Sequence, residues 1–301
     1  MTSQQTALHS QISKLMQSFS VEILPKDIYG DKIINSNLPK GAKVYIAHLP
    51  DTDFSEVVDA AIRVQKHGRQ AVPHLAVRKI ASLNSLHSDL ARLQTAGIDQ
   101  TLVIAGDAAV TDPVFENTMQ FLRTGLLEEH GFTRVGLAGH PEGLAFLSAD
   151  QSMQVLLEKS AYAAKSPIDF HINTQFTLNT QILTDWEKQI RGAGVDLEVH
   201  IGLAGAISSA KLLQYALRCG VGASVKLAAK NPIKMLQLVS KTRPEKIIIE
   251  IAKYQLENQN NQFRKIHLFP FGSFAKTVNW AMRISKGEFL LNEEQSDFHL
   301  L

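Results

Sequence analysis

The stretch FENTMQFLRTGLLEEHGFTRVGLAGHPEG, residues 115–143, contains the unit from which the fold is predicted. Its first part, residues 115–131, has apolar residues at the 3.6-residue spacing of an amphipathic helix and ends in Gly131, a common left-handed helix stop. A short apolar run follows and ends in His140 and Glu142. The stretch therefore predicts a helix, a glycine stop and a buried strand with ionisable groups at its carboxyl end.

The same unit recurs along the chain. Helical patterns at 53–68 and 85–97 also end in a glycine. Near-continuous apolar strands that alternate with helices are typical of a parallel sheet whose outer face is covered. Eight such units predict an α/β fold, a single-domain (β/α)8 TIM barrel, with an open doubly wound sheet as the alternative. The eight apolar runs are residues 19–25, 43–50, 70–77, 100–107, 134–141, 169–176, 196–205 and 265–272.

The predicted organisation is one catalytic barrel domain, residues 18–284, between an amphipathic N-terminal helix, 1–17, and a polar C-terminal tail, 285–301. Residues 245–259 begin like a strand but continue at helical spacing, so they are assigned to a helix. No low-complexity linker or Pro/Gly-rich hinge divides the chain.

The composition points to a cytoplasmic protein that acts on small molecules. The 31 basic and 29 acidic residues nearly balance, so no global field attracts nucleic acid or a membrane surface. The single Cys219 excludes an intramolecular disulfide and a multi-cysteine metal site. No signal peptide or membrane span is expected. The exposed helices at the two ends of the chain could form a homo-oligomer, and the sequence does not decide this.

Polar side chains stand near the carboxyl ends of six consecutive predicted strands, where a (β/α)8 barrel carries its chemistry. Each also has a structural interpretation: Asp107 could cap the next turn, and His48 and His74 could be satisfied core histidines. Strand histidines could also bind a metal, as in barrel hydrolases, but those enzymes usually open with a paired HxH that the first run lacks. The residues are Glu22, His48, His74, Asp107, His140, Glu142 and Gln175.

Several other classes are disfavoured because their motifs do not occur. The sequence has no GxGxxG after the first strand, no GxxxxGK[ST], no HExxH and no GxSxG. A Rossmann cofactor site, a P-loop ATPase, a zincin and an α/β-hydrolase are therefore not expected, and no metal site is predicted.

Six motifs in register resemble the methylenetetrahydrofolate reductase family, and most closely its short bacterial branch, which consists of the catalytic domain alone. The resemblance covers about residues 18–283. The motifs are VEILP (21–25), VPHLAVR (72–78), VIAGD (103–107), GLAGHPEG (136–143), NTQF (173–176) and LFPFGSFAKTVNWA (268–281).

The resemblance implies an FAD-dependent oxidoreductase of one-carbon metabolism that reduces 5,10-methylenetetrahydrofolate to 5-methyltetrahydrofolate with NADH or NADPH in a ping-pong cycle. It assigns Glu22 as the general acid that opens the folate ring and Asp107 as a catalytic residue beside the flavin. Gln175 and Leu203, with these two carboxylates, would bind the folate. Burial favours the neutral form of an acid, as this role needs. The residues implied in FAD binding are His48, His74, Ala105, Gly106, Asp107, Ala138, His140, Glu142 and Lys159.

The sequence departs from the family pattern at Ala105, Leu144 and Ala145, where polar flavin contacts are usual. These departures keep two alternatives open. One is the same barrel running methyltetrahydrofolate oxidation in a demethylation pathway. The other is a degenerate homologue that binds folate without flavin turnover.

Overall fold

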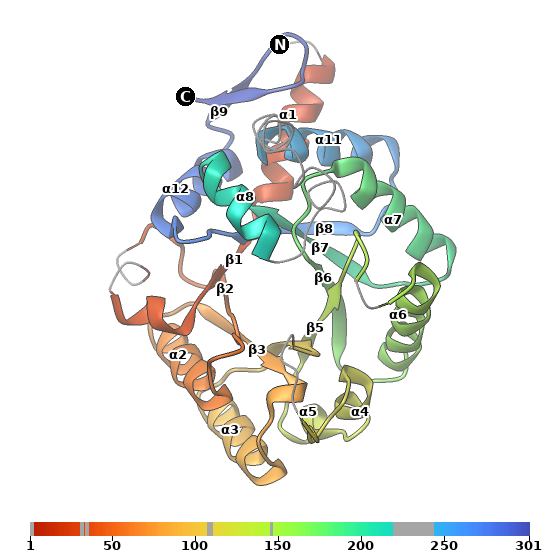
Figure 1. The fold of residues 1–301 in the computed structure, drawn as a ribbon. Helices are drawn as coiled ribbons and strands as arrows, with labels where there is room; N and C mark the ends of the chain where they lie inside the picture. Colours follow the sequence, from red (N-terminus) through yellow and green to blue (C-terminus); the bar gives the residue numbers. More distant parts are fainter. Residues whose placement is uncertain (1–2, 31–32, 34–35, 107–110, 145–146, 219–243) are drawn as a thin grey trace. The chain divides into compact units, whose positions relative to one another are not determined.

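The computed structural model describes residues 3–30, 33, 36–106, 111–144, 147–218 and 244–301, and Asp107, Ala145 and Cys219 lie outside them. Eight parallel strands form a closed barrel in the order β1 to β8 (Figure 1). Each strand overlaps one predicted apolar run, so the predicted α/β (β/α)8 barrel is confirmed. The strands are β1 (Ser20–Ile23), β2 (Lys43–Ile46), β3 (Gln70–Ala76), β4 (Gln100–Ile104), β5 (Arg134–Gly139), β6 (Asp169–Thr174), β7 (Glu198–Ala204) and β8 (Phe263–Phe269).

By its internal contacts the chain divides into two compact units. The first, called here the β1–β6 unit, comprises Ser20–Ala138 and Glu158–Asn173. The second, called the β7–β8 unit, comprises Met1–Phe19, Gly139–Leu157 and Thr174–Leu301. Each unit is described by itself below.

The helices of the β1–β6 unit begin and end where local sequence signals place them. α2 begins after Asp53, which forms a capping box with Glu56. Left-handed glycines follow the helices as predicted, with φ of +75° at Gly68 and +72° at Gly131. The elements are η1 (Pro25–Gly30), α2 (Phe54–Lys66), η2 (Val77–Lys79), α3 (Leu83–Thr95), α4 (Thr118–Leu122), α5 (Leu126–Glu129) and the end of α6 (Ala149–Ala163).

The helix predicted over residues 115–131 is broken in the structure. Gly125 adopts φ +73° and separates the short helices α4 and α5. Apolar spacing continues across the break, with Phe121, Leu122, Leu126 and Leu127 all buried. The helical spacing of apolar residues therefore continues across Gly125, although the left-handed backbone of Gly125 interrupts the α-helix.

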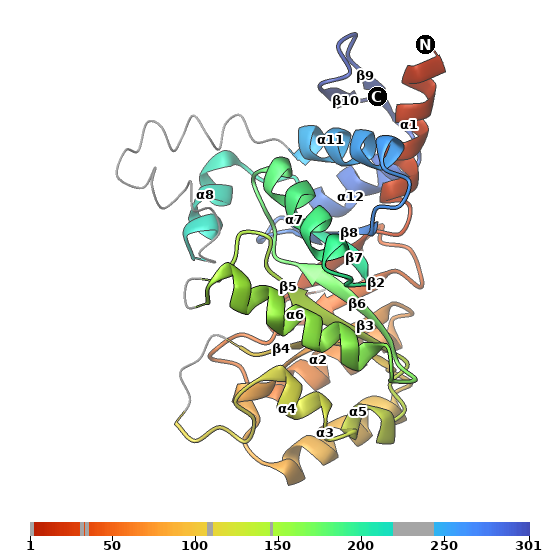
Figure 2. The ribbon, with the colours of Figure 1, turned by 90° about the vertical axis from the view of Figure 1, so that its right-hand side faces the viewer.

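In the β7–β8 unit the two ends of the chain come together. α1 packs against α11 and α12 (Figure 2). The predicted helix over residues 245–259 is confirmed as α11, which ends two residues earlier than predicted, at Glu257. The elements are α1 (Ser3–Met16), the start of α6, α7 (Thr180–Gly192), α8 (Ser209–Arg218), α11 (Pro244–Glu257), α12 (Phe274–Ser285), β9 (Phe289–Leu291) and β10 (Phe298–Leu300).

The C-terminal segment is more ordered than a polar tail. β9 and β10 form an antiparallel pair, and the rings of Phe289 and Phe298 lie 4.7 Å apart. His9 of α1 stacks on Phe289 at 4.1 Å. Two buried phenylalanines among polar residues supply the apolar contact that anchors the segment.

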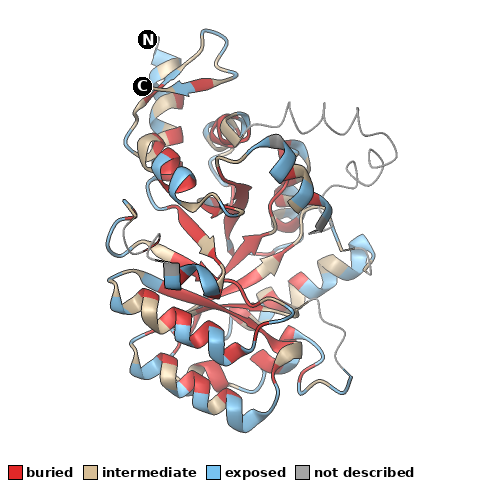
Figure 3. Cartoon of the chain, turned by 60° about the vertical axis from the view of Figure 1, so that its left-hand side comes forward, coloured by how far each residue is buried: buried red, intermediate tan, exposed pale blue. Residues whose placement is uncertain are grey.

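Burial follows the strands and one side of each helix (Figure 3). In α2 the buried residues recur at helical spacing, as the sequence predicts. Among the described residues, no helix combines the length and the apolar character needed to cross a membrane.

Candidate active site

The first three strands of the β1–β6 unit direct polar side chains to one face. Glu22 of β1 is the register partner of Tyr45 of β2, and Tyr45 is the register partner of Val72 of β3. Because side chains alternate along a strand, His74 points to the same side as Val72. Three chemically different groups, a carboxylate, a phenol and an imidazole, are thus brought together from three strands.

Tyr45 shows that this face is the barrel interior. Its hydroxyl lies 3.2 Å from Nε2 of His171 on β6, a strand that is not a sheet neighbour of β2. Two such strands meet through their side chains only inside the barrel. Burial raises the pKa of the Tyr45 phenol, and the charge of Arg134 and the side chain of Asn173 offset only part of that rise. Tyr45 is therefore a neutral, buried hydroxyl.

The structure pairs two of the predicted site residues directly. Oε2 of Glu22 lies 3.5 Å from Nε2 of His74, with 18% of the Glu22 side chain and 8% of the His74 side chain exposed. The ring of His74 also meets the ring of Tyr45 edge-on, with centroids 5.9 Å apart. A carboxyl group and an imidazole in this arrangement can hold one proton between them and pass it to a bound molecule.

His48 has a different role from His74. The backbone N–H of Ala76 donates to its Nδ1 at 3.1 Å, so Nε2 carries the proton and donates to the carbonyl of Thr52 at 3.1 Å. Burial, and then the charge of Lys79, lowers the pKa of His48 to about 4. Both ring nitrogens are committed to the backbone, which fits the structural interpretation of this residue.

The chain after β4 makes a close backbone approach. Gly106 has φ +90°, and a Cβ placed on it would lie 3.1 Å from Cβ of Ala76. The backbone N–H of Arg78 donates to the carbonyl of Ala105 at 3.1 Å. A glycine is required here, because φ is positive and a side chain would press on Ala76. The catalytic prediction for Asp107 lies outside the described residues.

Two other predicted cofactor residues differ sharply in character. Ala138 is half-buried in β5 and offers only its methyl group and backbone. Lys159 of α6 is 7% exposed, and burial lowers its pKa to about 8. Among the described residues, no hydrogen bond or ion pair engages its ammonium group. A buried cation of this kind has its charged form stabilised by an anion.

The remaining predicted residues belong to the β7–β8 unit. Oε1 of Glu142 accepts a hydrogen bond from the Thr177 hydroxyl at 2.9 Å, and its buried Oε2 has no partner among the described residues. Gln175 turns its own Oε1 to the backbone N–H of Phe176 at 3.0 Å. His140 is half-buried after β5, and Leu203 is fully buried in β7.

Sequence reasoning did not single out Tyr45 and Asn173. A signal was present, because Tyr45 lies between Val44 and Ile46 and Asn173 between Ile172 and Thr174, in runs already predicted to be buried strands. A polar side chain inside such a run needs a partner. Buried imidazoles also occur on the strands of the other unit, at His200 and His267.

Comparison with known proteins supports the architecture. No protein-family model matches the chain. Among solved structures, the fold is similar to that of an uncharacterized protein from Clostridium thermocellum, with a TM-score of 0.58 and 12% identity over 93% of this chain and 98% of that one. That protein binds two copies of 5-methyl-5,6,7,8-tetrahydrofolic acid. At 12% identity, this similarity shows that the two proteins share a fold.

Proposed function

We propose that this protein binds a reduced folate in its barrel and is an FAD-dependent oxidoreductase that reduces 5,10-methylenetetrahydrofolate to 5-methyltetrahydrofolate. The observation that carries the proposal is the Glu22 carboxylate on the inward face of β1, 3.5 Å from the His74 imidazole. The similar fold of a protein that binds a methylated tetrahydrofolate supports the same ligand class.

Glu22 has the chemistry that ring opening requires. The five-membered ring of the folate opens when N10 gains a proton, which yields the reactive iminium. Glu22 donates this proton from the carboxyl group, and His74 then stabilises the carboxylate that remains. The partial exposure of Glu22 toward the interior leaves a path to a bound substrate, whereas Tyr45 and His171 hold the surrounding wall.

FAD fits one feature of the β1–β6 unit, because the buried ammonium of Lys159 suits a diphosphate. When bound, FAD accepts hydride from NADH or NADPH and delivers it to the folate. His48 does not fit a direct contact through its ring nitrogens, since the backbone occupies both.

A second candidate function is folate binding without flavin turnover. It is favoured by the apolar side chains of Ala105 and Leu144 and by the committed nitrogens of His48. The third form, oxidation of methyltetrahydrofolate, uses the same residues, and its direction depends on the flavin potential and the electron acceptor.

The experiment that separates these functions is an anaerobic half-reaction series. Purified protein loaded with FAD should bleach with NADH or NADPH and recover its colour on addition of 5,10-methylenetetrahydrofolate. Glu22→Gln should keep the first half-reaction and slow the second by about 10²–10⁴-fold, the usual contribution of a general acid. Glu250→Gln, an exposed site on α11, serves as the matched control.

Three results would count against the proposal. Protein that binds 5-methyltetrahydrofolate calorimetrically but takes up no FAD would establish the binding function instead. Equal loss of both half-reactions in Glu22→Gln would remove Glu22 from the acid role. Absence of folate binding altogether would overturn both candidate functions.

A further inference from the structure

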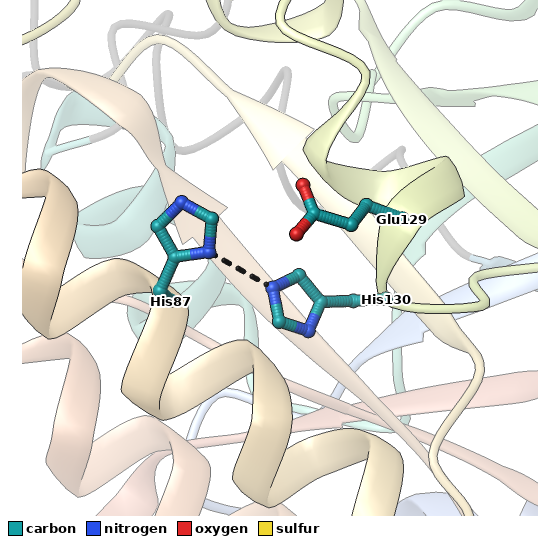
Figure 4. Close-up of side chains that lie close together, drawn as sticks. All are labelled: His87, Glu129 and His130. Carbon is teal, nitrogen blue, oxygen red and sulfur yellow. Dashed lines mark hydrogen bonds between the residues drawn. The ribbon is translucent and has the colours of Figure 1, made fainter.

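A second group of ligating side chains lies on the helical layer of the β1–β6 unit, away from the strands. His87 belongs to α3, Glu129 is the last residue of α5, and His130 follows it directly. Figure 4 shows the two imidazoles turned toward each other with the Glu129 carboxylate beside them. The ligand atoms of all three residues lie within 4.8 Å of one another. None of these residues takes part in the proposed folate chemistry.

The spacing of the two imidazoles matches tetrahedral coordination. Metal–nitrogen bonds of about 2.0–2.1 Å at a tetrahedral angle place two ligand nitrogens about 3.3 Å apart. Nδ1 of His87 and Nε2 of His130 are separated by 3.2 Å, and their rings are tilted by 56°. In the metal-free protein one nitrogen donates a hydrogen bond to the other. A cation between them would need only small ring movements.

The neighbouring glutamates show which carboxylate is available. Oε1 of Glu128 accepts hydrogen bonds from the hydroxyls of Tyr162 at 3.1 Å and Ser166 at 2.9 Å. Among the described residues, no hydrogen bond or ion pair engages the carboxylate of Glu129, which is exposed. Glu129 can therefore rotate toward the imidazoles without breaking an existing contact.

The backbone holds the two imidazoles in place before any metal arrives. α3 is fixed at its start by Ser82, whose hydroxyl accepts from the N–H of Ser85 at 3.1 Å. Gly125 is the N-cap of α5, and the N–H of His130 donates to the carbonyl of Leu126 at 3.1 Å. Ligands on ordered helix positions lose little conformational freedom on binding.

We propose that His87, Glu129 and His130 bind a divalent transition metal of the Zn²⁺ class, with water in the fourth position. Two imidazoles and one carboxylate suit Zn²⁺, whereas Mg²⁺ and Ca²⁺ prefer oxygen ligands. The metal would tie α3 to the segment that contains α4 and α5. The proposal is independent of the folate chemistry.

The test is calorimetric titration of tag-free, chelator-treated protein with ZnCl₂, together with the visible spectrum of the Co²⁺ form. We expect one tight site and the intense Co²⁺ bands of tetrahedral coordination. His87→Ala and His130→Ala should weaken binding by more than about 100-fold, the upper range for residues that merely support metal ligands. Glu129→Gln should weaken it less, because two imidazoles remain.

His67→Ala is the matched control. His67 directly follows α2, as His130 directly follows α5, and a glycine comes after each. The backbone angles are φ −89° and ψ 13° at His67 and φ −90° and ψ 13° at His130. This variant should bind Zn²⁺ as the parent does. Circular dichroism of each metal-free variant checks that it is folded. No site in the parent protein, or equal affinity in folded His87→Ala, would overturn the proposal.

Discussion

Two carboxylates, one in each unit, differ in their exposure and in the kind of group that they contact. Glu187 of α7 has a fully buried side chain in the β7–β8 unit. It accepts hydrogen bonds from Nε of Arg191 at 3.0 Å, the backbone N–H of Gln262 at 3.0 Å and the hydroxyl of Tyr254. Both carboxylate oxygens are saturated by groups from the helices and a loop, so Glu187 joins elements together and has no capacity for a ligand.

Glu22 differs in its exposure and in pairing with a titratable group. Its side chain retains 18% exposure, and its Oε2 lies 3.5 Å from Nε2 of the His74 imidazole. Burial alone does not distinguish a carboxylate with a structural role from one with a role in catalysis. The groups that contact the carboxylate and its remaining exposure distinguish the two. Four substitutions test this distinction.

Replacing Glu187 by Ala should have the largest effect on stability. The change leaves the Arg191 guanidinium and two other donors without their acceptor. Arg191 is 37% exposed, so water can solvate its charge, and the main cost comes from the two buried donors, the Tyr254 hydroxyl and the Gln262 N–H, at about 1–3 kcal/mol each. Urea unfolding followed by circular dichroism measures the loss, and Glu250→Ala on exposed α11 should change stability by less than about 0.5 kcal/mol. A loss below about 1 kcal/mol, less than the cost of one unsatisfied buried donor, would show that Glu187 does not have this structural role.

Acid should destabilise the protein through His48. The pKa of His48 is about 4 in the folded state and 6.5 in the unfolded chain. Between these pH values only the unfolded chain binds the proton, so stability present above pH 6.5 is lost as the pH falls toward 4. At about 1.4 kcal/mol per pKa unit, the loss approaches 3 kcal/mol. Unfolding curves of His48→Gln measured across this range should be flatter than those of the parent, while His67→Gln should match it.

Tyr45→Phe should have an intermediate effect. The substitution keeps the ring but removes the hydroxyl that lies 3.2 Å from His171. Leaving a buried polar group without its partner costs about 1–3 kcal/mol. Differential scanning calorimetry should show this loss, and Tyr29→Phe, at an exposed ring, should show almost none. An unchanged melting temperature in Tyr45→Phe would mean that the interior wall does not depend on this contact.

Glu22→Gln should have the smallest effect on stability. A glutamine has nearly the same shape and can still pair with His74, so the unfolding free energy should change by less than about 1 kcal/mol. The same variant should lose the folate half-reaction. Stability measured by urea unfolding and the half-reaction measured on the same preparation together sharpen the comparison. A loss as large as that of Glu187→Ala would place Glu22 among the structural carboxylates.

The regular parts of the fold were predictable because they depend on local patterns. The eight apolar runs gave eight strands, and Gly68, Gly97 and Gly131 ended segments as expected. Two local predictions failed where a single position or a pair of rings outweighed the pattern. Gly125 divided one predicted helix, and Phe289 with Phe298 turned a predicted polar tail into a hairpin.

The site was predictable only in part. The polar residues near strand ends lie on or directly after the predicted strands, and the structure brings Glu22 and His74 together. It also showed that His48, an equally plausible residue by sequence, has both ring nitrogens bound to the backbone. The contact between His87 and His130 could not be predicted from a sequence motif, because 43 positions separate them along the chain.

The sequence by itself determined the alternation of strands and helices and the strands that carry ionisable groups, because apolar spacing and glycine stops act over a few residues. Which partners each of those groups contacts, and how far each is buried, was settled by the packing of the whole chain. The physical reason is that hydrogen-bond partners such as Tyr254 for Glu187, or Ala76 for His48, come from distant parts of the chain. Whether such a partner lies within hydrogen-bonding distance depends on how the whole chain packs.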